Sequence, residues 1–464
     1  MPVAEAVATT GPLTLPARPR RAAHVIAVAP FALALAVGLW GIRRQNTLWG
    51  DEAVTYDLAH RDLAQIWRTA QHIDLVHALY YAVMHGVFGV LGDGLVPLRL
   101  PSVLATAAAA SAVALIGLRL AGPRAGLLAG LVLPLLPQVQ KYAQEGRSYA
   151  LVCALVAWAT YALLARRWTI YGVTMLLACL LHEFAVLALA AHGVTLAVSR
   201  RRLKAWGTTA ACVVAGLLPL AVASAGQSDQ VAWIGAPVRL SDVLVMGCVG
   251  VACARTPVRA RGPVRLAALA VPLVVVPTLL LLTASLVKPL FVDRYVLYGS
   301  IGVALLLGAA LDHLLRLSPR FACLAALAAL AALIPLSLSL RTPESRTNDA
   351  TAVTAAVREE ARPGDGILYL TGRHRFLSPA GSLTDLALAQ DPASSNTLAG
   401  VELPGREIAV RMLDFDRIVV VDATGGHVSD DPREAAKTNT LRDHFRAYRT
   451  TRVSGASVTV YVRR

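Results

Sequence analysis

Long apolar runs recur along most of this sequence, and they limit what the chain can fold into more than any other feature. A helix that crosses the hydrocarbon core of a bilayer needs about 20 mainly apolar residues. Candidate runs of roughly this kind occur about eleven times, at 22–42, 97–119, 125–141, 148–165, 169–182, 184–199, 206–225, 240–254, 264–287, 296–315 and 321–341. The sequence therefore predicts an α-helical polytopic membrane protein with about 11 transmembrane helices.

The overall composition agrees with a membrane protein. Hydrophobic residues make up 56% of the 464 residues and charged residues only 16%, which leaves too little charged surface for a soluble protein of this size. The formal net charge is +15, but the basic residues fall in short clusters between the apolar runs. That pattern is typical of cytoplasmic loops rather than of a nucleic-acid-binding face, so no nucleic acid partner is expected.

The basic clusters also predict an orientation, because short loops rich in Lys and Arg stay in the cytoplasm. Arg18, Arg20 and Arg21 place the N-terminal tail, 1–21, on that side. Five later clusters fall on the same side if 240–254 is kept as a span: Arg119/Arg124, Arg166/Arg167, Arg200–Lys204, Arg255–Arg265 and Arg316/Arg320. The opposite, outer face then receives 43–96, 138–147, 182–183, 226–239, 288–294 and everything after Arg341. We expect a multi-pass protein of the cell membrane with a transmembrane domain at 22–341.

The tail from 345 to 464 has a different pattern. It predicts an amphipathic helix at 347–362, strands at 367–370, 417–422 and 457–462, and a helical stretch near 431–448, whereas 372–408 shows little pattern. Alternating strand and helix signals indicate a small α/β domain, here on the extracytoplasmic side.

Two adjacent carboxylates, Asp51 and Glu52, directly follow the first apolar run. Acidic residues are poor membrane anchors, so they are either solvated loop acids or groups that activate or orient an acceptor hydroxyl. A second polar group follows in the same loop, where Asp74 precedes His77, Tyr81 and His85. The last three follow i, i+4, i+8 spacing, so on a helix they share a face. These side chains could line a cavity or belong to an interfacial helix. A metal site made of Asp74, His77 and His85 is the weaker alternative.

Three further polar groups lie at outer ends of the apolar runs. Tyr142, Glu145 and Arg147 belong to a dense polar segment, where they form either a cavity wall or a structural ion pair. Lys288, Arg294 and Tyr295 lie where a lipid phosphate would sit, and the alternative for the cations is an interfacial anchor. His182 and Glu183 form an outer-end pair with a capping or a cavity role.

Five segments resemble membrane glycosyltransferases of the GT-C fold: LWGDEAVT, DLVHALYYAVMH, LRLPSVLAT, YAQEGRSYALV and FVDRYVLY. They are most similar to the family 39-like transferases, which include protein O-mannosyltransferases and the aminoarabinose transferase of lipid A, and among these to the actinobacterial mannosyltransferase group. The resemblance covers roughly the first 315 residues. It departs at His77-Ala78, where many relatives carry Pro-Pro, and at Glu183, where relatives carry an aromatic residue or leucine.

The resemblance implies an inverting transferase that takes a sugar from a polyprenyl-phosphate donor. Mannose is the sugar that the family favours. Asp51 would be the catalytic acid-base residue with Glu52 supporting it, Arg147 and Arg294 would contact the donor phosphate, and Tyr142, Glu145 and His77 would line the cavity. Such a reaction is expected to need no cofactor, with metal independence favoured. The acceptor could be a protein, a glycolipid or a polysaccharide.

Two other classes remain open. A lipid or solute transporter or flippase usually shows repeated halves and broken helices near the bilayer midplane, and the sequence shows neither. A membrane scaffold that presents the C-terminal domain gives no reason for acidic and basic side chains to gather at the outer ends of the apolar runs.

Overall fold

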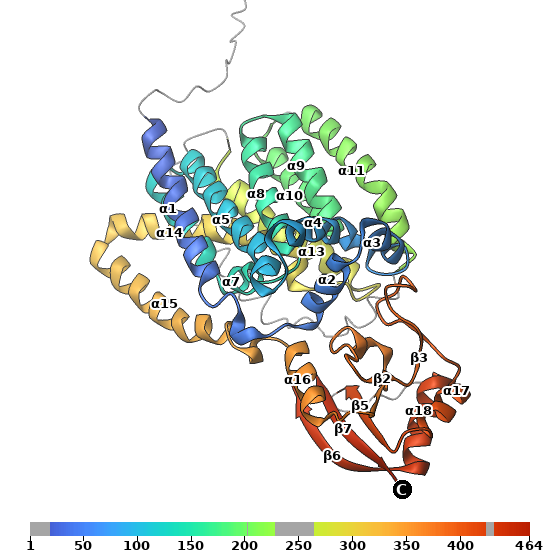
Figure 1. The fold of residues 1–464 in the computed structure, drawn as a ribbon. Helices are drawn as coiled ribbons and strands as arrows, with labels where there is room; N and C mark the ends of the chain where they lie inside the picture. The colour runs from blue at the N-terminus through green and yellow to red at the C-terminus, as the bar shows by residue number, and fades with distance from the viewer. Residues whose placement is uncertain (1–18, 202, 228–263, 424–430) are drawn as a thin grey trace, which may run out of the picture.

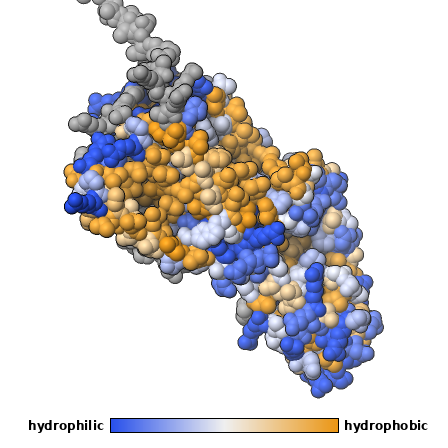
Figure 2. All heavy atoms as spheres, turned by 60° about the vertical axis from the view of Figure 1, so that its left-hand side comes forward, coloured by the Kyte–Doolittle hydropathy of each residue, from blue (hydrophilic) through white to orange (hydrophobic). Residues whose placement is uncertain are grey.

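The computed structural model describes residues 19–201, 203–227, 264–423 and 431–464. Figure 1 shows two parts, a large group of helices and a smaller sheet domain at the C-terminal end of the chain. Apolar side chains cover much of the helical part in Figure 2, whereas hydrophilic side chains are frequent on the C-terminal domain. This distribution is that of a membrane-embedded part carrying a water-exposed domain.

Within the described residues, six helices are long and apolar enough to cross a membrane. They are α1 (Pro19–Leu39), α5 (Leu95–Leu120), α11 (Lys204–Ala225), α13 (Leu266–Ala284), α14 (Gly299–Leu317) and α15 (Pro319–Ser339). Each coincides with a predicted run to within a few residues. The polytopic membrane class therefore holds.

The remaining apolar runs form shorter helices. These are α6 (Pro123–Val132), α8 (Tyr149–Leu164), α9 (Trp168–Leu181) and α10 (Leu187–Val198). A further short apolar helix, α4 (Ala78–Leu91), was not predicted as a span. The run predicted as one span at 125–141 is wrong as a single helix. It breaks into α6, a 3-10 turn at Leu133–Leu135 and α7 (Pro137–Ala143), because Pro134 and Pro137 cannot donate the helical backbone hydrogen bond. The run at 240–254 lies outside the described residues, and the count of spans stays a prediction.

The predicted outer loop 43–96 is largely helical. It contains α2 (Gly50–His60), α3 (Leu63–Ala70) and α4. Helix α3 begins at a capping box, in which Asp62 accepts from the backbone N–H of Gln65 and the Gln65 side chain accepts from Asp62 N–H. These helices fix the direction in which the acidic residues at the start of α2 point.

The C-terminal domain has a five-stranded sheet in the order β2-β1-β5-β7-β6. Its strands are β1 (Gly366–Tyr369), β2 (Thr384–Asp385), β5 (Arg417–Ala423), β6 (Phe445–Val453) and β7 (Ala456–Arg463), and β3 (Leu388–Gln390) pairs with β4 (Val401–Glu402) in a separate sheet. Strands β1, β2 and β5 run parallel, and β7 is antiparallel to both of its neighbours. Helices α16 (Ala350–Glu360), α17 (Gly405–Met412) and α18 (Pro432–His444) complete the domain.

Two expectations for this tail need correction. The helix predicted near 431–448 ends at His444, and Phe445 already belongs to β6, because β-branched and aromatic residues there pair with the last strand. The segment 372–408, which showed little pattern, contains β2, β3, β4 and the start of α17. Strands of two or three residues are too short to produce a visible alternation.

Candidate functional site

The Asp51 carboxylate lies between two guanidinium groups at the end of the helical part that faces the C-terminal domain. Asp51 is in the first turn of α2, and its Oδ2 atom is 3.4 Å from an Arg294 terminal nitrogen and 3.8 Å from Arg147 Nε. The Asp51 side chain is 26% exposed, and Oδ2 accepts no hydrogen bond within the described residues. The carboxylate is thus held by two ion pairs rather than by hydrogen bonds, and part of its side chain is exposed.

Arg147 connects this carboxylate to a second acid, Asp74. One terminal nitrogen of Arg147 donates to the Tyr81 hydroxyl at 2.7 Å and lies 3.4 Å from Asp74 Oδ2. Asp74 also contacts Tyr81 and His77, the latter at 3.0 Å from Nδ1. Burial alone would raise the pKa of Asp74, but His77 and Arg147 hold it well below its usual range. Asp74 therefore stays ionised and fixes Arg147 in place.

Arg294 lies among aromatic rings on the other side of Asp51. Its guanidinium carbon is 5.5 Å from the Tyr149 ring centre, 5.8 Å from Tyr295 and 5.9 Å from Trp49. His182 packs on Tyr295 with ring centres 4.6 Å apart. Burial, followed by the charges of His77 and Arg294, holds the pKa of His182 well below its usual range, so this ring is neutral at pH 7. Such rings stabilise a cation without neutralising it.

Tyr142 packs on Tyr149, and its hydroxyl connects α7 to the segment before α14. Its hydroxyl donates to Asp293 Oδ1 at 2.8 Å, and its ring centre is 5.8 Å from that of Tyr149. Asp293 also accepts from the backbone N–H of Arg294 at 2.8 Å. The hydrogen bond between Tyr142 and Asp293 therefore positions the residue next to Arg294.

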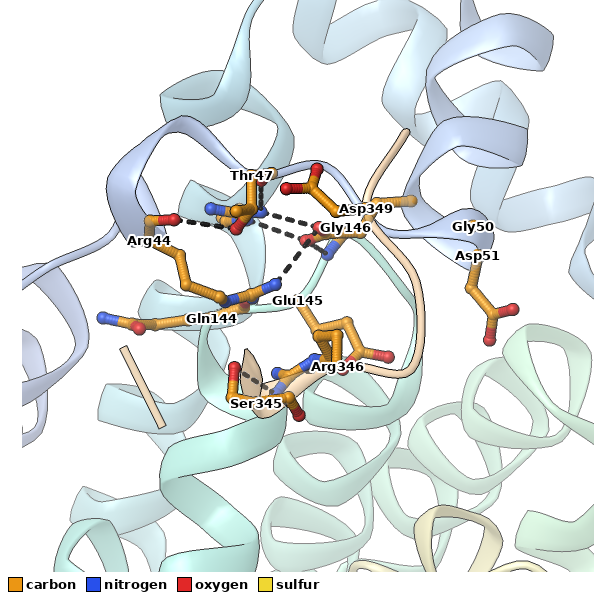
Figure 3. A network of polar contacts seen from close by, with 12 residues as sticks. Arg44, Thr47, Gly50, Asp51, Gln144, Glu145, Gly146, Ser345, Arg346 and Asp349 are labelled. Carbon is orange, nitrogen blue, oxygen red and sulfur yellow. Dashed lines mark hydrogen bonds and ion pairs between the residues drawn. The ribbon is translucent and has the colours of Figure 1, made fainter. Parts of the chain in front are cut away.

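Glu52, the neighbour of Asp51, has a different environment. It is fully buried and accepts two hydrogen bonds from Arg99 at 2.7 and 2.6 Å and one from the backbone N–H of Gly146 at 3.0 Å. Arg44 lies 3.5 Å away. Burial alone would raise the pKa of Glu52, but Arg99 and Arg44 lower it to about 2. Figure 3 shows part of this network, with the Asp51 side chain pointing away from it. Glu52 holds the segment before Arg147 against α2 rather than facing the Asp51 site.

Glu145 is also buried and pairs with the segment that leads into the C-terminal domain. Its Oε2 atom is 3.4 Å from an Arg346 terminal nitrogen, while Oε1 has no hydrogen-bond partner in the described part of the chain. The same Arg346 nitrogen donates to the Lys141 backbone oxygen at 2.9 Å. Figure 3 shows Arg346 beside Glu145. Burial raises the pKa of Glu145 to about 6, although Arg346 opposes the shift.

The structure brings most of the predicted site residues into one connected group. Lys288 stands apart: it is half-buried, and no side-chain hydrogen bond or ion pair joins it to this group among the residues described. His85 also points elsewhere, with Nδ1 3.0 Å from the Ala59 backbone oxygen. No group of three His, Cys, Asp or Glu side chains suited to a metal is found in the described segments, so the alternative metal site with Asp74, His77 and His85 does not form there.

Sequence reasoning missed several residues that build this site. Arg99 is fully buried inside the predicted run 97–119, and an ionisable residue in an apolar run is itself a signal of a paired partner. Arg44 follows the first run, and Arg346 and Asn348 follow the last. They resemble ordinary flanking residues in the sequence. Only the folded chain brings Arg346 to Glu145, 201 positions earlier, and Asn348 to Gly50, 298 positions earlier.

Comparisons with known proteins give a fold but no family. No protein-family model matches this chain, and no curated protein does. Two crystal structures of ArnT from Cupriavidus metallidurans are similar. The apo structure has a TM-score of 0.60 and 13% identity over 95% of this chain and 98% of that one. The structure of ArnT bound to undecaprenyl phosphate has a TM-score of 0.54 and 14% identity over 93% and 97%. At this identity the likeness shows the fold alone, a GT-C fold that spans nearly the whole chain.

Proposed function

We propose that this chain is an inverting glycosyltransferase that moves a sugar from a polyprenyl-phosphate donor to an acceptor at the outer face of the membrane. One observation carries the proposal: in a GT-C fold, the Asp51 carboxylate lies within 4 Å of two guanidinium groups, those of Arg147 and Arg294. An acid that can take a proton and two cations that can bind phosphate are the groups that this reaction requires.

The two arginines suit the donor. A polyprenyl phosphate leaves as an anion, so it needs cationic stabilisation, and guanidinium groups bind phosphate oxygens through charge-assisted hydrogen bonds. The ArnT structure with undecaprenyl phosphate supports a lipid phosphate as the ligand of this fold. Arg147 and Arg294 contact Asp51 only at 3.8 and 3.4 Å, distances at which a phosphate can compete for them. Lys288 remains a further candidate for the phosphate.

Asp51 suits the acceptor. In the proposed step the acceptor hydroxyl oxygen forms a bond to the anomeric carbon while the bond from that carbon to the phosphate oxygen breaks. The configuration at the anomeric carbon inverts, the hydroxyl proton passes to Asp51, and the electron pair leaves with the phosphate. The Asp51 side chain is 26% exposed, so its carboxylate can be reached by the acceptor hydroxyl.

Two finer parts of the proposal, mannose as the sugar and the absence of a cofactor, rest on the resemblance of the sequence motifs. The basic clusters support a cytoplasmic N-terminus with an extracytoplasmic C-terminal domain, which we also propose. Transport is the competing function. It predicts movement of a lipid or solute with no covalent product, so product analysis separates the two.

Replacing Asp51 by asparagine tests the proposal. Asp51→Asn keeps the size of the side chain but removes the base, and we expect turnover to fall by about 10²–10⁴-fold, the usual contribution of a positioned acid or base. The measurement is mass spectrometry of product formed by the purified protein from a panel of polyprenyl-phosphate sugars and cell-envelope acceptors.

The matched control is Asp93→Asn. Asp93 is an exposed acid beyond α4 that contacts Tyr56 and His60, and its replacement should leave turnover unchanged. Full turnover in Asp51→Asn, with both variants folded in detergent, would contradict the role of Asp51.

A further inference from the structure

The helix that carries Asp51 has no capping side chain of its own. The residue before α2 is Trp49, and no side-chain hydrogen bond caps the helix from there. The first backbone N–H groups of a helix have no partner within the helix and need one from elsewhere. The N–H of Gly50 donates at 2.6 Å to Asn348 Oδ1, a residue 298 positions later in the chain.

Asn348 is itself fixed by the C-terminal domain. The next residue, Asp349, donates its backbone N–H to the Ser454 oxygen at 3.0 Å, in the turn between β6 and β7. Gly455 in that turn has φ +88° and lies so close that a Cβ atom there would overlap the Cβ of Asn348. On the other side, the backbone N–H of Ala350 donates to the Leu48 oxygen at 2.7 Å.

The contact with α2 is also close. A Cβ atom at Gly50 would lie 3.1 Å from Asn348 Nδ2, so a larger residue there would push Asn348 by a few tenths of an ångström. Backbone and side chain together therefore join the β6–β7 turn to the segment 48–50, one residue before Asp51. The C-terminal domain and the proposed base are connected by direct contacts rather than by a flexible tether.

We propose that Asn348 is a positioning residue for Asp51. The β6–β7 turn presses Asn348 onto Gly50, which fixes the first turn of α2 and holds the Asp51 carboxylate between Arg147 and Arg294. The inference rests on the proposed function. The C-terminal domain would then act on the reaction by positioning Asp51, without contacting the reacting atoms.

The expected effect is on turnover and not on donor binding. A displacement of a reacting group by about 1 Å can cost on the order of 10²-fold in rate. Loss of the Gly50 cap leaves Arg147 and Arg294 in place. For Asn348→Ala we expect kcat to fall by about 10- to 100-fold, with KM for the polyprenyl-phosphate sugar within about twofold of the starting value.

Two further variants make the test specific. Asn348→Asp keeps an oxygen that can accept from Gly50 N–H and is favoured at a helix N-terminus, so it should restore most of kcat. Gly455→Ala leaves Asn348 intact but pushes it from its position, so it should lower kcat as Asn348→Ala does.

The matched control is Asn396→Gly. Asn396 accepts from Arg68 Nε at 3.1 Å and thus also links the C-terminal domain to the helical part, but at α3. Glycine accepts the positive φ of 52° at this position, so the variant removes one hydrogen bond without straining the backbone. It should keep full kcat.

Several results would overturn the inference. They are unchanged kcat in Asn348→Ala, an equal loss in Asn396→Gly, a rise in KM instead of a fall in kcat, or loss of the folded protein in both Asn348→Ala and Gly455→Ala. If Asn348→Ala keeps full kcat while Asp51→Asn loses turnover, only the positioning role of Asn348 is overturned. Full activity of Asp51→Asn would instead remove the proposed function on which the inference rests.

Discussion

Neighbouring acids at the start of α2 have opposite surroundings. Glu52 is fully buried and accepts hydrogen bonds of 2.6 and 2.7 Å from Arg99, whereas the 26% exposed Asp51 has charged neighbours only at 3.4 and 3.8 Å. Short hydrogen bonds to a buried carboxylate stabilise the fold, because breaking them leaves an unpaired charge in the protein interior. Longer contacts to a partly exposed carboxylate can be exchanged for a ligand. Glu52 therefore holds the structure, and Asp51 is the acid that can take part in the proposed reaction.

Glu145 provides a pH-dependent test of the contact with Arg346. Its folded-state pKa is about 6 against an ordinary value of 4.5, so the folded protein keeps a proton that the unfolded chain has already lost. Stability is fully present below pH 4.5 and is lost as pH rises to about 6. The difference corresponds to about 2 kcal/mol. Thermal unfolding in detergent across this range should show that loss in the original protein and not in Glu145→Gln.

The control for this titration is Glu344→Gln, at a fully exposed acid on the same connecting segment. It should keep the loss of stability between pH 4.5 and about 6, because a hydrogen bond with Thr342 lowers the pKa of Glu344 and its own titration lies below that range. An identical pH dependence in Glu145→Gln would show that Glu145 is ionised throughout, and the buried pair with Arg346 would then be an ordinary salt bridge.

How far single residues could be predicted depends on the distance to their partners in the sequence. Asp51, Arg147 and Arg294 stand out because each is a charge beside an apolar run, and the structure brings them together. Asn348 and Arg346 give no such signal. Asn348 contacts Gly50 and Arg346 contacts Glu145, and both partners lie hundreds of residues earlier in the chain. No local sequence pattern indicates these contacts.

The membrane helices differ in how well their ends and crossings could be predicted from the sequence. Long apolar helices were predictable because hydropathy is a property of the segment itself. The break in 125–141 was harder to predict, since prolines are tolerated within membrane helices, as Pro272 and Pro277 are in α13. Where α14 crosses α6, Gly308 lies against the backbone of Ala129. Small residues at such a crossing allow two backbones to approach closely.

Gly308→Ala tests this crossing. The added methyl group would overlap the nitrogen and Cα atoms of Ala129, and backbone atoms cannot move aside as a flexible side chain can. Overpacking of this kind usually costs about 1–3 kcal/mol, so the thermal unfolding midpoint in detergent should fall by several degrees. Gly86→Ala on α4 is the matched control, because a methyl group there meets no atom within 4 Å and should leave the midpoint unchanged. Equal midpoints for the two variants would contradict the close crossing of α6 and α14.

At the scale of the whole molecule, segments that were predicted to lie on one side of the membrane do meet at one end of the helical part. Asp51, Asp74, Arg147 and Arg294 come from three separate segments and form one group of charges. The segment after α15 joins them through Arg346. In Figure 1, α1 begins at the end away from the C-terminal domain and leads toward it. An orientation with this end outward places the proposed transfer and the C-terminal domain in the same compartment.

Cysteine labelling in intact cells tests that orientation. In a chain whose six native cysteines are replaced by alanine, Tyr448→Cys adds a thiol on β6, where the original side chain is 67% exposed. Arg124→Cys adds one at the start of α6, where the arginine side chain is 59% exposed and the basic cluster predicts the cytoplasm. A maleimide that cannot cross membranes should label Cys at 448 in intact cells and Cys at 124 only after permeabilisation. Labelling of both after permeabilisation serves as the control for accessibility. The reverse pattern in intact cells would place the Asp51 group in the cytoplasm, where a lipid-linked donor on the outer leaflet could not reach it.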